Sequence, residues 1–289
     1  MRDYAITTDS SCDFDQALAD SLGVTVVPLS VQIGPRRFRN APGEAMDSHS
    51  FYQLLSQGEL AQTSAPNVEE FKAVWRPILQ SGRDLLYLGF SSGLSGTYHN
   101  AAIAAEDLRE EFPEARIITV DTLCASLGQG MLVDLTVQEK RQGKTLDEAV
   151  AFAEKNRLHL CHWFTVGDLS QLRRGGRLSA GKAIVGNLLN IKPVLHVDDE
   201  GHLVPMASAK GRKKSIEALV SHMEESAVAP EQQRVYISHG DCLADAQLLA
   251  QMVRDRLHVS SVTIGDVGPV IGAHSGAGTL ALFFVGTHR

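Results

Sequence analysis

The segment DLLYLGFSSGLSGTYHN, residues 84–100, combines the features that decide the fold. Its apolar run Leu85–Phe90 is typical of a strand buried inside a parallel sheet. A turn rich in serine and glycine follows, and from Tyr98 to Glu111 apolar residues recur at helical spacing. A strand, a tight turn and a helix in this order gather free backbone N–H groups, hydroxyls and the positive end of the helix dipole. The segment therefore predicts either an anion site, for a phosphate or a carboxylate, or a tight connection with no ligand.

The first half of the chain alternates between predicted strands and helices. Further strands are expected at Tyr4–Thr8 and Arg116–Val120, whereas Arg36–Gly43 reads as a loop. This alternation is typical of a Rossmann-like parallel sheet with helices on both faces. Polar clusters at Asp9–Ser11 and Asp121–Thr122 follow strand ends, as the Ser/Gly turn does. We expect all three clusters at the edge of the sheet where α/β proteins bind ligands.

The second half has a different pattern. Two strand-like runs between Ile191 and Ser208 flank an Asp-Asp-Glu-Gly turn, which predicts a β-hairpin. We expect a helix over Ala180–Leu189 and a glycine-rich loop over Gly268–Gly278. Hairpins mixed with helices favour an α+β domain with a mixed sheet. The predicted fold class is thus α/β with two closely packed domains, residues 1–160 and 161–289.

Composition argues against several classes of protein. Hydrophobic residues make up 44% and charged residues 21%, as in ordinary globular proteins. The net charge of -7 argues against a nucleic-acid-binding protein, which normally carries a basic surface. We find no apolar run long enough for a membrane helix and no signal-peptide core, so we expect a cytoplasmic protein. The residues show neither metal-ligand spacing nor a phosphate-binding P-loop, and the four cysteines are scattered. No metal and no cofactor are predicted.

One enzymatic interpretation is a serine hydrolase. Gly89–Gly93 matches the nucleophile pattern G-x-S-x-G, with Ser91 as the nucleophile. Later acidic residues and histidines, such as Asp121 and His239, could complete the order Ser, Asp, His. Against this interpretation, the pattern requires a helix directly after the nucleophile, whereas Gly93–Gly96 keeps the chain in a loop. It also arises readily by chance in a chain with 25 glycines.

The other interpretation is a carboxylate site. Thr63, Ser64 and Ser95 supply neutral donors, the amides of Gly93–Gly96 add more, and Arg177 offers a planar charged fork. A carboxylate taken out of water needs its oxygens fully hydrogen-bonded. Plain helix capping would also explain the two hydroxyls before the helix, and a solvated basic loop would explain the arginine.

Two further features call for an explanation. His274 lies on the last glycine-rich stretch, where its apolar neighbours make it a candidate to face the same cleft, although most loop histidines are simply exposed. Lys210, Arg212, Lys213 and Lys214 form a basic cluster in an acidic protein. Positive charge at a helix N-terminus is mildly unfavourable. The cluster is therefore either a solvated helix start or a docking patch for a partner.

Motifs spread over nearly the whole chain resemble those of the DegV family. They are TTDSSCDF at 7–14, TSAP at 63–66, GFSSGLSGTYHNA at 89–101, VDTLCASLGQG at 120–130, LRRGGRLS at 172–179, KPVL at 192–195 and GPVIGAHSGAG at 268–278. The family comprises fatty-acid-binding proteins with two α/β domains and the ligand between them. In several bacteria such a protein is the binding subunit of fatty acid kinase, in phospholipid metabolism. The resemblance implies a long-chain fatty acid as ligand, a separate ATP-binding kinase subunit as partner, and no enzymatic activity of the chain alone.

The resemblance also assigns roles to residues. Thr63 and Ser95 would hydrogen-bond the carboxylate. Arg177 and His274 would lie beside the head group and steady it or its phosphorylated form. The stretch Lys210–Lys214 resembles the region that engages the kinase. The bound fatty acid is then the only expected ligand.

An acyl tail needs an apolar tunnel, because each buried CH₂ contributes about 0.8 kcal/mol. The predicted helix Ala183–Leu189 and strand Leu280–Val285 are candidates to line it, or they belong to the core. Besides the hydrolase with Ser91, a sugar- or ketone-binding module stays open, because the binding subunit of dihydroxyacetone kinase has a related fold. Lipid transport or storage without a kinase also stays open.

Overall fold

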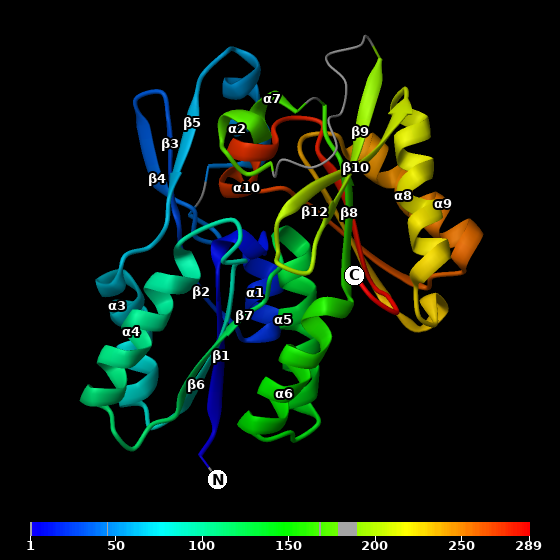
Figure 1. The fold of residues 1–289 in the computed structure, drawn as a ribbon. Coiled ribbons are helices and arrows are strands. Elements are labelled where there is room, and N and C mark those ends of the chain that lie inside the picture. Colours follow the sequence, from blue (N-terminus) through cyan, green and yellow to red (C-terminus); the bar gives the residue numbers. More distant parts are fainter. Residues whose placement is uncertain (1, 45, 168, 179–189) are drawn as a thin grey trace.

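Three sheets form the framework of the computed structural model, which describes residues 2–44, 46–167, 169–178 and 190–289 (Figure 1). The first sheet is parallel, in the strand order β2-β1-β6-β7. Its strands are β1 (Tyr4–Asp9), β2 (Thr25–Val27), β6 (Asp84–Gly89) and β7 (Ile117–Asp121). The two central strands, β1 and β6, are buried along their whole length. This confirms the predicted parallel sheet of the N-terminal half.

The second large sheet is mixed, in the order β10-β9-β8-β13-β11-β12. Its strands are β8 (Leu160–Thr165), β9 (Ile191–Val197), β10 (Leu203–Lys210), β11 (Arg234–His239), β12 (Ser261–Asp266) and β13 (Leu280–Val285). Only β11 and β12 run parallel, and the other neighbours are antiparallel. The predicted hairpin is present as β9 and β10, and the predicted α/β fold with a mixed second sheet is confirmed.

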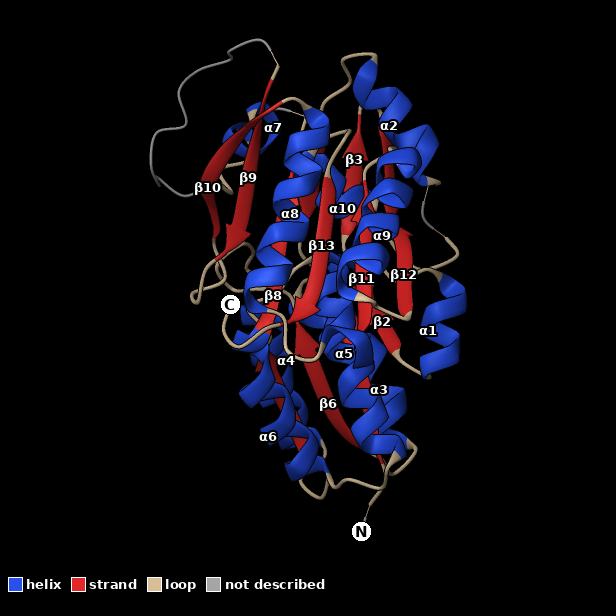
Figure 2. Cartoon of the chain, turned by 90° about the vertical axis from the view of Figure 1, so that its right-hand side faces the viewer, coloured by secondary structure: helices blue, strands red, loops and turns tan. Residues whose placement is uncertain are grey.

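Helices cover both faces of each large sheet (Figures 1 and 2). The helices of these layers are α1 (Gln16–Leu22), α3 (Val68–Gln80), α4 (Thr97–Glu111), α5 (Ser126–Arg141), α6 (Leu146–Asn156), α8 (Arg212–Ser226) and α9 (Leu243–Leu257). α3 and α4 pack on one face of the first sheet, and α1, α5 and α6 pack on the other. α8 and α9 cover the outer face of the second sheet.

Helix α5 lies between the two large sheets. It contacts β1 and β6 of the first sheet and β8, β11 and β13 of the second, and it is buried on almost every side. Two glycines allow this close fit, because a side chain at Gly128 would collide with the His162 ring and one at Gly130 would collide with Phe14. The start of α5 is thereby fixed at the junction of the two sheets.

A small antiparallel sheet, in the order β4-β3-β5, stands above this junction. It consists of β3 (Ser30–Ile33), β4 (Arg36–Arg39) and β5 (Ala61–Ser64), and helix α2 (Ser48–Ser56) follows β4. The loop predicted over Arg36–Gly43 is therefore wrong for its first residues. The arginines of β4 are exposed, so this strand lacks the apolar alternation by which strands are recognised.

The loop predicted over Gly268–Gly278 is also wrong in part, because Pro269–Ser275 forms helix α10. A proline at the first helical position costs nothing there, since that N–H has no partner within the helix. The apolar side of α10 packs against α2 and the small sheet. The remaining short helices are α7 (Ser170–Arg174), η1 (Ser10–Cys12), η2 (Arg157–His159) and η3 (Pro230–Gln232).

The predicted helix Ala180–Leu189 lies outside the described residues. Among the described helices, none is both long enough and apolar enough to cross a bilayer.

Candidate functional site

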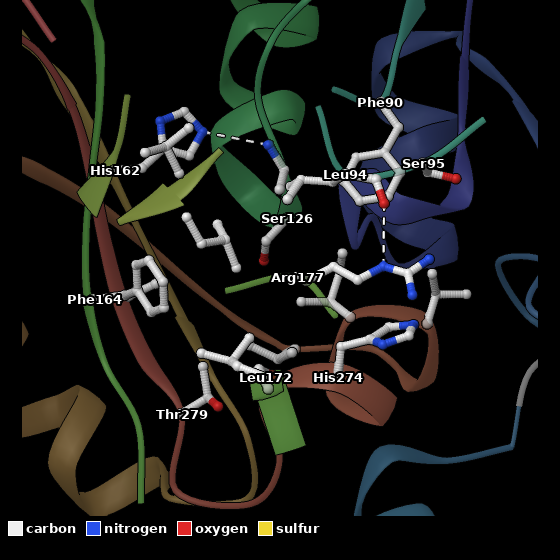
Figure 3. Close-up of a pocket in the computed structure, with 18 of the residues that line it drawn as sticks. Phe90, Leu94, Ser95, Ser126, His162, Phe164, Leu172, Arg177, His274 and Thr279 are labelled. Carbon is white, nitrogen blue, oxygen red and sulfur yellow. Dashed lines mark hydrogen bonds between the residues drawn. The ribbon is translucent and has the colours of Figure 1, made fainter. Parts of the chain in front are cut away.

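A cavity of about 230 Å³ opens where the two large sheets meet the small one. Its wall comes from β5, the turn after β6, the start of α5, the second sheet, α7 and α10 (Figure 3). Apolar side chains form most of this wall: Leu29, Ala65, Phe90, Leu94, Ala125, Phe164, Leu172, Val197, Leu203, Val267, Val270, Ile271, Ala281 and Phe283. The predicted lining by strand Leu280–Val285 thus holds for its alternate residues Ala281 and Phe283.

One end of the cavity is polar. Thr63 on β5, Ser95 and Gly96 in the turn after β6, Arg177 after α7, and His274 on α10 all line it. These residues are distant in sequence, and four separate segments of the chain bring them together. The sequence prediction placed all five at one site, and the structure places all five on one cavity.

Hydrogen bonds fix the polar side chains in place. Thr63 Oγ1 lies 2.8 Å from His274 Nε2. Arg177 donates from Nε to the Leu94 carbonyl at 3.2 Å and from Nη1 to the Gly175 carbonyl. Figure 3 shows the guanidinium reaching across the cavity mouth to the Ser/Gly turn, directly above His274. The arginine therefore ties α7 to the turn and carries a fixed positive charge beside the polar end.

The electrostatics of this end follow from partial burial. Removal from water, and secondly the charge of Arg177, lower the pKa of His274 to about 4. At neutral pH the imidazole is thus uncharged, with one nitrogen as donor and the other as acceptor. The positive charge at this end comes from Arg177, and the hydroxyls and the imidazole add neutral hydrogen-bonding groups. This set suits a single carboxylate.

The polar clusters expected at the ligand-binding edge of the sheet follow the neighbouring strand ends, and two of their carboxyl groups hydrogen-bond to the Ser/Gly turn and the strand before it. Asp9 Oδ2 accepts hydrogen bonds from the Phe90 amide at 2.9 Å and from the Tyr87 hydroxyl at 2.7 Å. Asp121 Oδ1 accepts from the Ser92 amide at 3.2 Å. Asp9 is fully buried, and this burial raises its pKa. These carboxyl groups position the turn and do not line the cavity.

Ser64, predicted to belong to the carboxylate site, does not line the cavity, and its side chain is exposed. Neighbouring residues of a strand point to opposite faces, so Thr63 and Ser64 cannot both face the ligand. The prediction is wrong for Ser64 for this reason. Strand β5 therefore contributes one hydroxyl to the cavity, that of Thr63.

Ser91 has the geometry of a structural residue. Its side chain is fully buried, and its Oγ donates to the Gly201 carbonyl at 2.8 Å and accepts from the Gly93 amide at 3.2 Å. The hairpin turn between β9 and β10 covers it, and a Cβ at Gly93 would lie only 2.7 Å from the Glu200 carbonyl oxygen. No described histidine is hydrogen-bonded to Ser91. This arrangement does not support the hydrolase interpretation.

The basic cluster lies away from the cavity wall. Lys210 ends β10, and Arg212 and Lys213 begin α8, in the upper part of Figure 1 at the level of α7. Arg212 forms an ion pair with Asp245 at 2.8 Å. The two lysines are exposed, so they remain available for a contact at the surface.

Several polar residues of the cavity were not foreseen from the sequence. They are Ser126, His162, Ser238, Ser275 and Thr279. His162 lies on the side away from Arg177 and His274 in Figure 3, and burial above all lowers its pKa well below its ordinary value. The position of Ser126 just after a strand end was a usable signal. His162 and Ser238 lie within strands, Ser275 ends a short helix and Thr279 directly precedes β13, and none of them carries a local pattern.

These features define a class: an α/β protein of two large sheets that encloses a small-molecule cavity with an apolar wall and one polar end. The family model described as "Uncharacterised protein, DegV family" matches residues 3–287. The chain belongs to the DegV family.

Relatives match the chain over nearly its whole length. A DegV domain-containing protein of Clostridium perfringens is 41% identical over 286 residues, which cover 99% of this chain and 98% of the relative. A DegV domain-containing protein of Streptococcus pyogenes is 36% identical over 283 residues, 98% of each chain. The family assignment therefore rests on the complete fold and not on one motif.

Solved structures of the family agree with the fold. A structure described as fatty acid binding of a DegV family protein from Thermus thermophilus has a TM-score of 0.87 and 32% identity, and the match covers 99% of this chain and 100% of that one. A structure described as DegV, a fatty acid binding protein from Bacillus subtilis, has a TM-score of 0.85 and 27% identity, with the same coverage. Structural neighbours of this chain are thus fatty-acid-binding DegV proteins.

Proposed function

We propose that this protein binds a long-chain fatty acid in the cavity, between the proposed domains 1–160 and 161–289, and does not act as an enzyme alone. One observation carries the proposal: a single cavity joins a mostly apolar wall to one polar end that contains Thr63, Ser95 and Arg177. The likeness to fatty-acid-binding relatives supports the same ligand class.

The polar end matches the needs of a carboxylate. The hydroxyls of Thr63 and Ser95 and the amide of Gly96 supply neutral donors, and Arg177 supplies the opposite charge. Neutral His274 can donate from one ring nitrogen while the other accepts. A carboxylate held in this way keeps its hydrogen bonds when it leaves water, which avoids a cost of several kcal/mol.

The apolar wall provides most of the affinity. Phe90, Phe164 and Phe283 line the cavity together with aliphatic side chains. Each CH₂ moved from water onto such a wall contributes about 0.8 kcal/mol. The tail therefore sets the strength of binding, whereas the polar end sets the orientation of the ligand.

In the proposed role the protein presents the carboxylate to a separate ATP-binding kinase subunit, in phospholipid metabolism. A carboxylate oxygen would attack the terminal phosphate of ATP held by that subunit, forming an acyl phosphate and releasing ADP. Gly96 at the polar end is exposed, so this end of the ligand lies near the surface. Lys210 and Lys213 are the proposed contacts for the kinase, with Arg212 held in place by Asp245.

Lipid extraction tests the ligand class. The protein is purified without added lipid and denatured, and the released compounds are identified by mass spectrometry. We expect a long-chain fatty acid in near-stoichiometric amount. Recovery of no acid, together with no binding of added stearic acid in titration calorimetry, would contradict the proposal. Covalent labelling of Ser91 by a fluorophosphonate probe would instead favour the hydrolase.

A further inference from the structure

The cavity wall contains a second pair of polar side chains besides those assigned to the carboxylate. Ser126 at the start of α5 and Ser238 on β11 both line the cavity, and their Oγ atoms lie 3.0 Å apart. Both side chains are buried, with exposures of 5% for Ser126 and 0% for Ser238. In Figure 3 the Ser126 hydroxyl points into the space framed by Phe164, Leu172 and Arg177.

The buried carboxyl group of Asp13 contacts Ser126 of this pair. Asp13 Oδ2 lies 2.5 Å from Ser126 Oγ, and Asp13 Oδ1 accepts a hydrogen bond from the Gly268 amide at 3.1 Å. Burial above all raises the pKa of Asp13 to about 8. The three groups form a chain of hydrogen bonds that ends at Ser238, whose hydroxyl faces the cavity with bonding capacity left over.

Ser275 also lines the cavity, and its hydroxyl has no hydrogen-bond partner among the described residues. Its side chain is 6% exposed. A plain hydrocarbon chain laid across this wall would leave the Ser275 hydroxyl unpaired, and buried unpaired hydroxyls are costly. The proposed function assigns the carboxylate to Thr63, Ser95 and Arg177 and leaves these serines without a role.

We infer that the cavity takes an acyl chain that carries a hydroxyl group, whose oxygen hydrogen-bonds either to the pair Ser126 and Ser238 or to the unpartnered hydroxyl of Ser275. The inference rests on the proposed function, because it names a subclass of the same fatty acid ligand. A hydroxyl group fits better than a keto group, because it both donates and accepts. It therefore pairs with Ser238 whichever way the protons along the Asp13 chain are oriented.

The test compares stearic acid with hydroxystearic acids whose hydroxyl lies near the carboxyl end, in the middle or near the methyl end. Dissociation constants are measured by titration calorimetry on the delipidated protein and on the double variant Ser238→Ala/Ser275→Ala. We expect at least one hydroxystearic acid to bind the wild-type protein no more weakly than stearic acid. In the double variant the preference for that acid over stearic acid should fall by about fivefold or more, the loss of roughly one hydrogen bond.

One control variant and one substitute variant complete the comparison. Ser215→Ala removes a buried serine of α8 that bonds the Arg212 carbonyl at 2.8 Å outside the cavity, and it should leave the preference unchanged. Ser275→Ala alone removes a hydroxyl that has no hydrogen-bond partner among the described residues. If thermal unfolding shows that the double variant is not folded, Ser275→Ala replaces it. The expected fall in the preference for the hydroxystearic acid is again about fivefold or more.

The outcomes separate the two hypotheses. If stearic acid binds but every hydroxystearic acid binds more weakly, or if the preference falls by less than about fivefold, the inference is wrong and the proposed function stands. If neither stearic acid nor any hydroxystearic acid binds, the proposed function itself is wrong.

Discussion

Thr63 Oγ1 and His274 Nε2 are 2.8 Å apart although their residues are separated by 211 positions in the sequence. This hydrogen bond joins the small sheet, through β5, to helix α10 at the polar end of the cavity. It also orients the imidazole ring, because the nitrogen that faces Thr63 is fixed while Nδ1 faces the backbone near Gly175. The two residues thus define the geometry on which the carboxylate proposal depends.

Removal of either head-group hydroxyl should weaken binding. We expect Thr63→Ala and Ser95→Ala each to reduce the affinity for stearic acid by about 1–3 kcal/mol, because a carboxylate oxygen loses its donor in a buried setting. Titration calorimetry on the delipidated protein measures the change. Ser64→Ala is the matched control, since this neighbouring side chain is exposed and outside the cavity. Equal affinities for the wild-type protein and both cavity variants would refute the head-group assignment.

His274 should make the ligand-free protein less stable in mild acid. Its pKa is about 4 in the folded protein and about 6.5 when unfolded, so the unfolded chain binds more protons between these values. The free energy of unfolding therefore falls as the pH drops from 7 to 5, by on the order of 1–2 kcal/mol from this group. Urea unfolding at the two pH values should show a smaller drop for His274→Gln. A drop of the same size in both proteins would show that the imidazole is not held neutral by the fold.

Asp13 should have the opposite effect between about pH 4 and pH 8. Its pKa is about 8 in the folded protein and near 4 when unfolded, so the folded chain binds more protons between these values. The free energy of unfolding then falls as the pH rises, by about 1.4 kcal/mol per pH unit in the middle of this range. In Asp13→Asn this contribution is absent, which urea unfolding at pH 6 and pH 7.5 would reveal. Parallel pH profiles of variant and wild type would contradict the prediction.

The Ser/Gly turn should tolerate a methyl group at one glycine and not at another. A Cβ at Gly93 would lie 2.7 Å from the Glu200 carbonyl oxygen, whereas one at Gly96 would meet nothing within 4 Å. We expect Gly93→Ala to lower the free energy of unfolding by about 1–3 kcal/mol, because the β9–β10 turn must shift. Gly96→Ala, with φ of -71°, should stay within about 0.5 kcal/mol of the wild type. Chemical denaturation measures both, and equal losses would argue against the tight contact.

Sequence patterns predicted most of the framework because its elements carry strong periodic signals. β6 was recognisable as a continuous apolar run, and it is buried at every position. β4 was missed because three of its four residues are arginines at a surface. α10 was missed because its glycines and proline resemble a loop, and only packing against α2 and the small sheet makes it a helix.

The candidate site could be predicted for residues that are hydrogen-bond donors and that lie in a recognisable sequence motif. Thr63, Ser95 and Arg177 were chosen as donors for one anion, and all three line the cavity. Ser64 has the same chemistry, but it lies next to Thr63 on β5 and its side chain therefore points to the opposite face of the strand. The pairing of Ser126 with Ser238 could not be predicted, since two isolated serines reveal a contact only after α5 and β11 are placed side by side.

The enclosure of α5 between the two large sheets limits how the ligand can enter. Sliding one sheet past the other would expose a helix that is buried on almost every side, at a cost of about 25 cal/mol for each Å² of apolar surface. The two sheets and helix α5 should therefore keep their positions relative to one another. Entry of the proposed fatty acid would then depend on smaller displacements of β5, α7 and α10, which also line the cavity.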